Sequence, residues 1–336
     1  DASCPPNSPG CEAYDFDGDG VVNLQDDFPG DPSCAFQNDD NCSACGVGCA
    51  ENATCQPEGE CACTFGWIGE ACELSVPQLL SSGFAHTCAI QAEGLAVCWG
   101  EEDYSASSFL TFVGLSAGDG FTCGRYRGGQ IGCWGKLPGW AFSSPSESFE
   151  KLSSGGAHAC GVRSSGTVEC WGLNFNGEGT PPSGSFQEIA AGSSHTCGLR
   201  SDGMAECWGA NLDDQSSPPT GLFEALSSGY VHTCGLRPDG SAECWGSNFY
   251  GQSNPPSGAF LTISAGGGHT CGLRPTAMVE CWGDDRFGQS SPPSEVFHAV
   301  SAGGNHTCGL RPDGSVECWG LNDDGQATPP EGYTWK

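Results

Sequence analysis

The chain has 336 residues, enough for more than one domain, and its 41 acidic and 11 basic residues give a formal net charge of −30. A surface this acidic repels phosphate backbones and anionic lipids, so the composition argues against a nucleic-acid-binding or membrane-surface protein. The 24 cysteines indicate disulfides and therefore an extracellular or cell-surface location.

Charge is distributed unevenly along the chain. Residues 1–75 contain 15 Asp and Glu and no Lys or Arg, whereas residues 76–336 contain all 11 basic residues. We expect three regions, at 1–41, 42–75 and 76–336, with the main boundary at Leu74–Pro77. No apolar run is long enough to cross a bilayer, so no membrane insertion is expected. The chain opens at Asp1 without a signal segment, which favours a processed or trimmed form.

Residues 15–26 have the spacing of a calcium-binding loop. Asp or Asn stands at loop positions 1, 3, 5, 9 and 12, and a glycine allows the bend at position 6. The expected ligands are Asp15, Asp17, Asp19, the Val21 carbonyl and Asp26. With residues 27–32 the loop resembles those of thrombospondin type-3-like repeats and of dockerins. The alternative is an acidic turn without metal, but its carboxylates would repel one another without a cation.

Six cysteines follow between residues 45 and 72. Their last part, from Cys61 to Cys72, resembles an epidermal-growth-factor-like module. That resemblance implies the bridges Cys45–Cys55, Cys49–Cys61 and Cys63–Cys72, whereas the sequence alone allows fifteen pairings. For the remaining cysteines we expect Cys4–Cys11 and Cys34–Cys42.

The rest of the chain is a repeat. Cys-Trp-Gly occurs seven times, and from the second copy onward the spacing is 37 residues. Each copy follows another cysteine by ten residues. Such a period indicates one supersecondary unit that buries its apolar face against the next. Short strands with Gly-rich turns and no helical periodicity predict four-stranded blades. We therefore expect an all-β, seven-bladed propeller with a small disulfide-rich, calcium-binding N-terminal region.

A hairpin centred on Pro-Asp-Gly joins the two cysteines of each repeat. In the fifth repeat a three-residue loop would pair Arg237 with Ser241 and Cys234 with Cys244, as a non-hydrogen-bonded pair close enough for a disulfide. The expected blade bridges are Cys88–Cys98, Cys123–Cys133, Cys160–Cys170, Cys197–Cys207, Cys234–Cys244, Cys271–Cys281 and Cys308–Cys318.

The repeat, as in Val300–Pro329, resembles that of regulator-of-chromosome-condensation propellers. Its short blade is most similar to the compact bacterial branch that includes β-lactamase inhibitory protein II. The resemblance covers residues 76–336 and implies the fold; it is weak for activity, because relatives range from nucleotide-exchange factors to inhibitors and photoreceptors.

Some residues recur at one repeat position. A histidine two residues before the first cysteine suggests a metal ligand, but six equivalent copies favour a structural hydrogen bond. Five arginines lie diagonal to glutamates across the hairpins, which predicts ion pairs. The tryptophans are expected to pack between blades. The histidines are His86, His158, His195, His232, His269 and His306.

Departures from the repeat indicate a possible binding surface. The second repeat has Phe121 in place of histidine, and it is followed by a basic, aromatic loop at 136–142. Aromatic and arginine side chains on adjacent loops are typical of binding sites. The alternative is that these repeats are merely imperfect near the seam that closes the ring. The candidates are Arg125, Tyr126, Arg127, Trp140 and Tyr250, with further loop aromatics at Phe175, Tyr230, Phe249 and Phe287.

The C-terminal residues 333–336 align with a strand position that Val76–Leu79 also addresses. The tail either clasps the ring beside the first strand or binds a neighbouring molecule through Trp335, which would propagate into a fibre.

No catalytic constellation or phosphate-binding loop is found. We therefore expect a secreted, disulfide-stapled, non-enzymatic scaffold, with calcium as its cofactor, that binds a protein or glycan through propeller loops. The alternative is a structural subunit of an extracellular filament or surface layer, in which the chain binds other copies of itself head to tail.

Overall fold

The computed structural model describes residues 53–55, 61–63, 67–68, 74–75, 79–91, 93–101, 111–137, 145–332 and 335. The chain divides into two compact units, Asp1–Ser75 and Val76–Lys336. In the first unit, β1 (Ala53–Cys55) pairs with β2 (Cys61–Cys63), and β3 (Trp67–Ile68) pairs with β4 (Leu74–Ser75). The calcium loop expected at 15–26 and the five expected N-terminal bridges lie outside what the structure describes.

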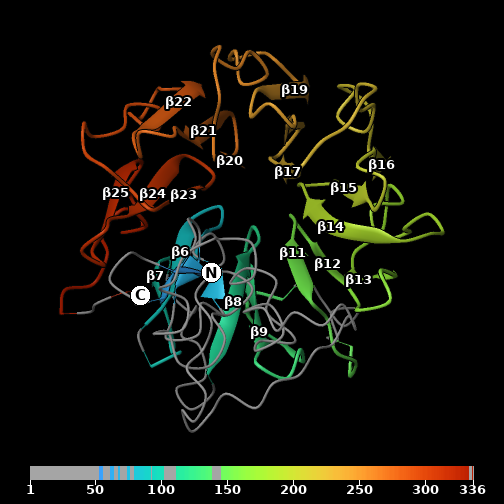
Figure 1. Ribbon diagram of the computed structural model, residues 1–336, viewed down its shortest axis with the longest axis horizontal. Coiled ribbons are helices and arrows are strands. Elements are labelled where there is room, and N and C mark those ends of the chain that lie inside the picture. Colours follow the sequence, from blue (N-terminus) through green and yellow to red (C-terminus); the bar gives the residue numbers. More distant parts are fainter. Residues whose placement is uncertain are drawn as a thin grey trace, which may run out of the picture. The chain divides into compact units, whose positions relative to one another are not determined.

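The second unit confirms the seven-bladed propeller (Figure 1). In each antiparallel blade the first strand lies nearest the centre and the third at the rim. Blades 1 to 4 are β5 (Leu80–Ser82), β6 (His86–Ile90) and β7 (Ala96–Gly100); β8 (Phe112–Ala117), β9 (Phe121–Tyr126) and β10 (Ile131–Gly135); β11 (Lys151–Ser154), β12 (His158–Val162) and β13 (Val168–Gly172); β14 (Phe186–Ala191), β15 (His195–Arg200) and β16 (Ala205–Gly209). Blades 5 to 7 are β17 (Ala225–Ser228), β18 (His232–Leu236) and β19 (Ala242–Gly246); β20 (Thr262–Ala265), β21 (His269–Leu273) and β22 (Val279–Gly283); β23 (Ala299–Ala302), β24 (His306–Leu310) and β25 (Val316–Gly320).

Each blade has three strands, so the expectation of four was wrong. Three of the described segments at the place of the fourth strand make a single bridge pair each, as Ser241 does with Ala259. The two prolines of such a segment have no N–H to donate to a ladder. The loop before them is held instead by its own asparagine, since Asn248 Oδ1 accepts the Ser253 N–H at 3.1 Å.

The hairpins have the predicted register. Arg237 N donates to Ser241 O at 2.8 Å, and Cys234 lies opposite Cys244 with their Cα atoms 4.0 Å apart. All seven blade cysteine pairs are joined by disulfides in this way.

The core lies between the blades, where aromatic rings pair. Phe223, just before β17, packs on Trp245 of the same blade with centroids 5.6 Å apart, and Trp245 also packs in a cluster with Leu199 of the preceding blade. The Trp245 indole donates to Gln215 O of the loop between those blades at 3.0 Å. A Cβ on Gly235 would lie 2.4 Å from the Phe223 ring, so only glycine fits there.

The six repeated histidines are buried structural residues. In each, Nε2 hydrogen-bonds to a threonine Oγ1 of the next blade; His232 and Thr270 lie 2.8 Å apart. Burial lowers the pKa of His232 to about 3, so the ring is neutral. In the described residues no group of His, Cys, Asp and Glu could hold a metal ion, and the structural interpretation is therefore the one that fits.

The C-terminal tail clasps the ring. Trp335 is 4% exposed, donates its N–H to Gly314 O of blade 7 at 2.9 Å and bridges Gln91 of blade 1. Its ring lies 5.7 Å from Trp99, in the place that a phenylalanine takes in the other six blades. Trp335 is therefore not available as an anchor for a neighbouring molecule.

Candidate binding face

Both ends of the strands carry connections, and the two ends differ. His232 pairs with Gly246, so the turn before β18 and the loop after β19 lie at one end, which we call the loop face. The hairpin turn from Arg237 to Ser241 lies at the other end, which we call the hairpin face.

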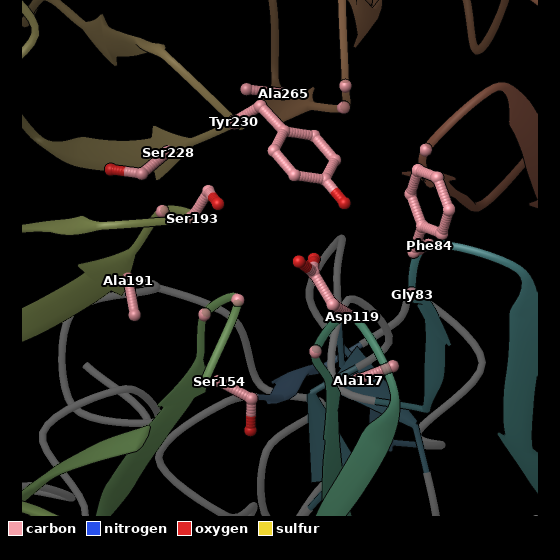
Figure 2. A pocket seen from close by; sticks show the side chains of 18 of the residues that line it. Gly83, Phe84, Ala117, Asp119, Ser154, Ala191, Ser193, Ser228, Tyr230 and Ala265 are labelled. Carbon is pink, nitrogen blue, oxygen red and sulfur yellow. The ribbon is translucent and has the colours of Figure 1, made fainter. Parts of the chain in front are cut away.

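The loop face surrounds the mouth of the central channel, a hollow of about 80 Å³ (Figure 2). One residue per blade, directly after a glycine at the end of the first strand, forms its edge. These residues are Phe84, Asp119, Gly156, Ser193, Tyr230, Gly267 and Gly304. Because four of them are glycine or serine, the three larger side chains define the mouth.

Those three side chains point toward one another (Figure 2). The Tyr230 hydroxyl donates a hydrogen bond to the Asp119 carboxylate, and the Phe84 ring meets the Tyr230 ring edge-on at 5.7 Å. Burial raises the pKa of Asp119, and the hydrogen bond from Tyr230 opposes that rise. Burial, followed by the Asp119 charge, raises the pKa of Tyr230, which therefore stays a hydrogen-bond donor.

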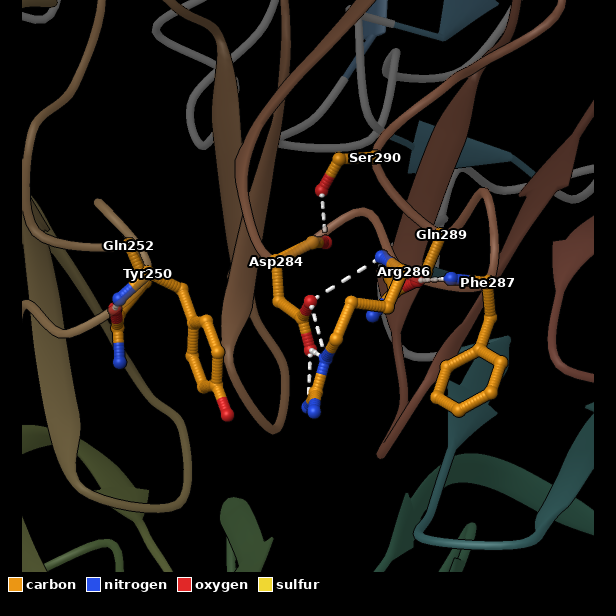
Figure 3. A network of polar contacts seen from close by, with 7 residues as sticks. All are labelled: Tyr250, Gln252, Asp284, Arg286, Phe287, Gln289 and Ser290. Atoms are coloured by element: carbon orange, nitrogen blue, oxygen red, sulfur yellow. Dashed lines mark hydrogen bonds and ion pairs between the residues drawn. The ribbon is translucent and has the colours of Figure 1, made fainter.

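A second pocket, of about 380 Å³, adjoins the mouth and shares Phe84 and Tyr230 as walls. Its outer wall is Tyr250, against which the Arg286 guanidinium lies 4.7 Å from the ring centroid. Arg286 is also paired with the buried Asp284, through Nε and Nη2 (Figure 3). The pKa of Asp284 is lowered, and the largest cause is the hydrogen bond that its carboxylate accepts from Arg286.

Exposed apolar side chains lie on three loops of this face, and one of them, Phe249, lines the second pocket. Phe175, Leu212 and Phe249 occupy the same position in the loops of three successive blades, 37 residues apart, and are 84%, 96% and 84% exposed. The same position holds Arg286 and Asp323 in the next two blades. Side chains this exposed contribute little to the fold. We call these three residues the apolar arc of the loop face.

The sequence candidates fall in different places. Tyr250 lines the second pocket, but Arg125, Tyr126 and Arg127 belong to the hairpin face. Tyr126 stacks on Phe112 with centroids 4.8 Å apart, where blades 3 to 7 place an arginine. Trp140 lies outside the described residues.

Phe121 also has a structural explanation. It takes the histidine position of blade 2, and the residue that would receive the hydrogen bond in blade 3 is Ala159 instead of threonine. The two pack in one buried cluster. This departure from the repeat is therefore compensated inside the protein and does not mark a ligand.

The sequence prediction missed Asp119, Leu212 and the Asp284–Arg286 pair. Each is a variable residue at a position that neighbouring repeats fill with something else, so an alignment of the seven repeats on one another contains the signal. Such an alignment does not show which repeat positions surround the channel.

The comparisons agree with this fold. Residues 149–178, 186–215, 223–252, 260–289 and 297–326 match the Regulator of chromosome condensation (RCC1) repeat. No curated protein matches the chain significantly. No helix in the described residues is long and apolar enough to cross a membrane.

Several solved propellers are similar. The ectodomain of the Physcomitrella patens receptor kinase CR4 is 30% identical, with a TM-score of 0.64 over 72% of each chain. The CRINKLY WD40 ectodomain of the Arabidopsis thaliana receptor kinase ACR4 is 27% identical, with a TM-score of 0.63 over 74% of this chain and 97% of its own. Prp20p from Saccharomyces cerevisiae shares the fold at 16% identity, with a TM-score of 0.60 over 76% of this chain and 86% of its own. The chain belongs to the family of RCC1-type repeat propellers.

Proposed function

We propose that the protein is a secreted, non-enzymatic scaffold that binds a protein partner through its loop face. The apolar arc of Phe175, Leu212 and Phe249 carries this proposal, because it exposes three large side chains at equivalent positions, and the last of them lines the second pocket. Large apolar side chains exposed on one face of a protein are a feature of interaction surfaces. Aromatic side chains and arginine, such as Tyr250 and the exposed Arg286 beside it, are enriched in binding hot spots.

Two observations support an extracellular location. Seven disulfides persist only in an oxidising compartment. The similar propellers of CR4 and ACR4 are receptor ectodomains. A filament subunit is the second candidate, but it would need a joint other than Trp335, which is buried in its own ring.

The proposal is tested by replacing Phe175, Leu212 and Phe249 together with Ser. Immobilised wild-type and variant proteins are incubated with extracellular fluid from the source organism, and the captured proteins are quantified by mass spectrometry. We expect the variant to lose at least 90% of one specific partner, because each lost apolar contact weakens binding by on the order of 1 kcal/mol or more.

The matched control replaces three exposed apolar side chains near the hairpin turns, Met204, Leu222 and Val296, with Ser. It should retain the partner, and both variants should keep the wild-type melting temperature. Equal capture by the two variants would contradict a binding role for the loop face.

We further propose that calcium is held at 15–26 in a thrombospondin type-3-like loop, followed by an epidermal-growth-factor-like module at 42–75. Adding calcium to chelator-treated protein should protect the chain from proteolysis near Asp17, because the metal neutralises the clustered carboxylates. Asp17→Asn combined with Asp19→Asn should abolish that protection. Protection that is independent of calcium would exclude the site.

A further inference from the structure

The mouth of the channel contains a carboxylate without a cation. Among the described residues Asp119 has no ion pair, and its side chain is hydrogen-bonded to the Tyr230 hydroxyl. The described residues that line the mouth include no Lys, Arg or His. A carboxylate that is partly withdrawn from water is costly unless a charge-assisted partner compensates it.

The neighbouring pocket shows the same combination with its cation in place. There a buried carboxylate, Asp284, and a tyrosine ring, Tyr250, hold the Arg286 guanidinium between them. At the mouth, Asp119 and Tyr230 repeat that pair and Phe84 adds a second ring. Among the described residues, a cation occupies the first arrangement and none occupies the second.

The described loops of this face have no unpaired cation for the mouth. In the described part of the loop face, the basic side chains are Lys136 and Arg286, which are paired with Glu101 and Asp284. The net charge of −30 attracts basic partners over a distance. A hollow of about 80 Å³ has room for several water molecules, and therefore for one basic head group and part of its stem.

We propose that the channel mouth binds a basic side chain, lysine or arginine, of the protein partner. The ammonium or guanidinium group donates to the Asp119 carboxylate, and the rings of Phe84 and Tyr230 flank it by cation–π contact. This site rests on the proposed function, because the partner that covers the apolar arc also covers the mouth.

The test uses small probes and the intact protein. N-acetyl-lysine methylamide and N-acetyl-arginine methylamide are titrated by NMR, with the neutral N-acetyl-norleucine and N-acetyl-citrulline methylamides as controls. We expect the cationic probes to bind at least ten-fold more tightly than their neutral counterparts, and Asp119→Asn to remove that difference. Phe84→Ala should weaken the cationic probes several-fold, which supplies a second variant if Asp119→Asn folds poorly.

The matched control is Asp323→Asn, which removes the same charge from an exposed loop on the same face. It should leave the affinity of both cationic probes unchanged within two-fold. Equal binding of arginine and citrulline, or an equal loss in both Asn variants, would overturn the proposal. The triple Ser variant of the arc should still bind the probes, so failure of the partner-capture experiment and failure of this site are distinguishable.

Discussion

Individual residues at the blade interfaces depart from the repeat in pairs. Where blade 2 has Phe121 in place of histidine, blade 3 has Ala159 in place of threonine, and a polar contact becomes an apolar one. Likewise Tyr126 replaces an arginine and Gly132 replaces its glutamate; a Cβ on Gly132 would lie 2.2 Å from the Tyr126 hydroxyl oxygen. One change without the other would leave a buried polar atom unpaired or a clash.

This compensation predicts the outcome of a transplant. His232→Phe alone removes the hydrogen bond to Thr270, and Thr270→Ala alone removes the partner of His232, so each should cost about 1–3 kcal/mol in the free energy of unfolding. The double variant reproduces the natural pair and should cost less than the sum of the two. Urea unfolding of all four proteins measures this coupling; strict additivity would show that the pair is not a unit.

The loss of His232 in the double variant also changes how stability depends on pH. Burial lowers the pKa of His232 to about 3 and that of His269 to about 4, below the ordinary value of 6.5. The unfolded chain therefore takes up protons first, so stability is full above about pH 6.5 and is lost as the pH falls towards 4 and 3. The double variant has one such histidine fewer, and its melting temperature should fall less steeply between pH 7 and 4 than that of the wild type.

At the scale of the element, the contacts of one arginine side chain replace the pairing of a fourth strand. The Arg237 guanidinium pairs with Glu243, donates to the carbonyls of Leu222 (2.9 Å) and Thr220 (3.0 Å), and lies 3.9 Å from the Phe223 ring centroid. These contacts tie the incoming segment to the hairpin, while the disulfide joins the second and third strands. The third strand stays a short edge of five residues, which limits pairing with other chains. The ion pair was foreseeable from the hairpin register; the bonds to the carbonyls were not.

At the scale of the whole molecule, the ring is closed by side chains from both ends of the propeller. Between blades 1 and 7, Ser82 N donates to Ser301 Oγ at 2.8 Å. The equivalent bond between blades 6 and 5 runs from Ala265 N to Ser227 Oγ at 2.9 Å. Trp335 completes the seventh ring pair on Trp99. The seam between blades 7 and 1 therefore repeats the contacts of the other joints.

Trp335 should contribute strongly to the stability of the joint between blades 7 and 1. Trp335→Ala leaves a cavity beside Trp99 and should destabilise the propeller by about 3–5 kcal/mol. Hydrogen exchange should quicken first in β5, β6 and β7, which lose their neighbour. Trp335→Phe is the matched control, because phenylalanine fills this place in the other blades, and it should cost much less. A monomer as stable as the wild type after Trp335→Ala would show that the tail does not close the ring.

The sequence by itself determined what depends on nearby residues and on the period. The hairpin register, the cysteine pairing and the arginine–glutamate pairs follow from residues at most ten apart, and seven repeats of one unit predict the propeller. The pairing of Phe121 with Ala159 and the meeting of Phe84, Asp119 and Tyr230 were decided only by the tertiary structure. These residues are 35 or more positions apart, and ring closure, not local propensity, brings them together. Trp140 lies outside the described residues and stays a prediction. Arg125, Tyr126 and Arg127 lie at the hairpin face and not at the pocket, because irregularity in a packed ring also arises from compensated contacts, such as that of Tyr126 with Gly132.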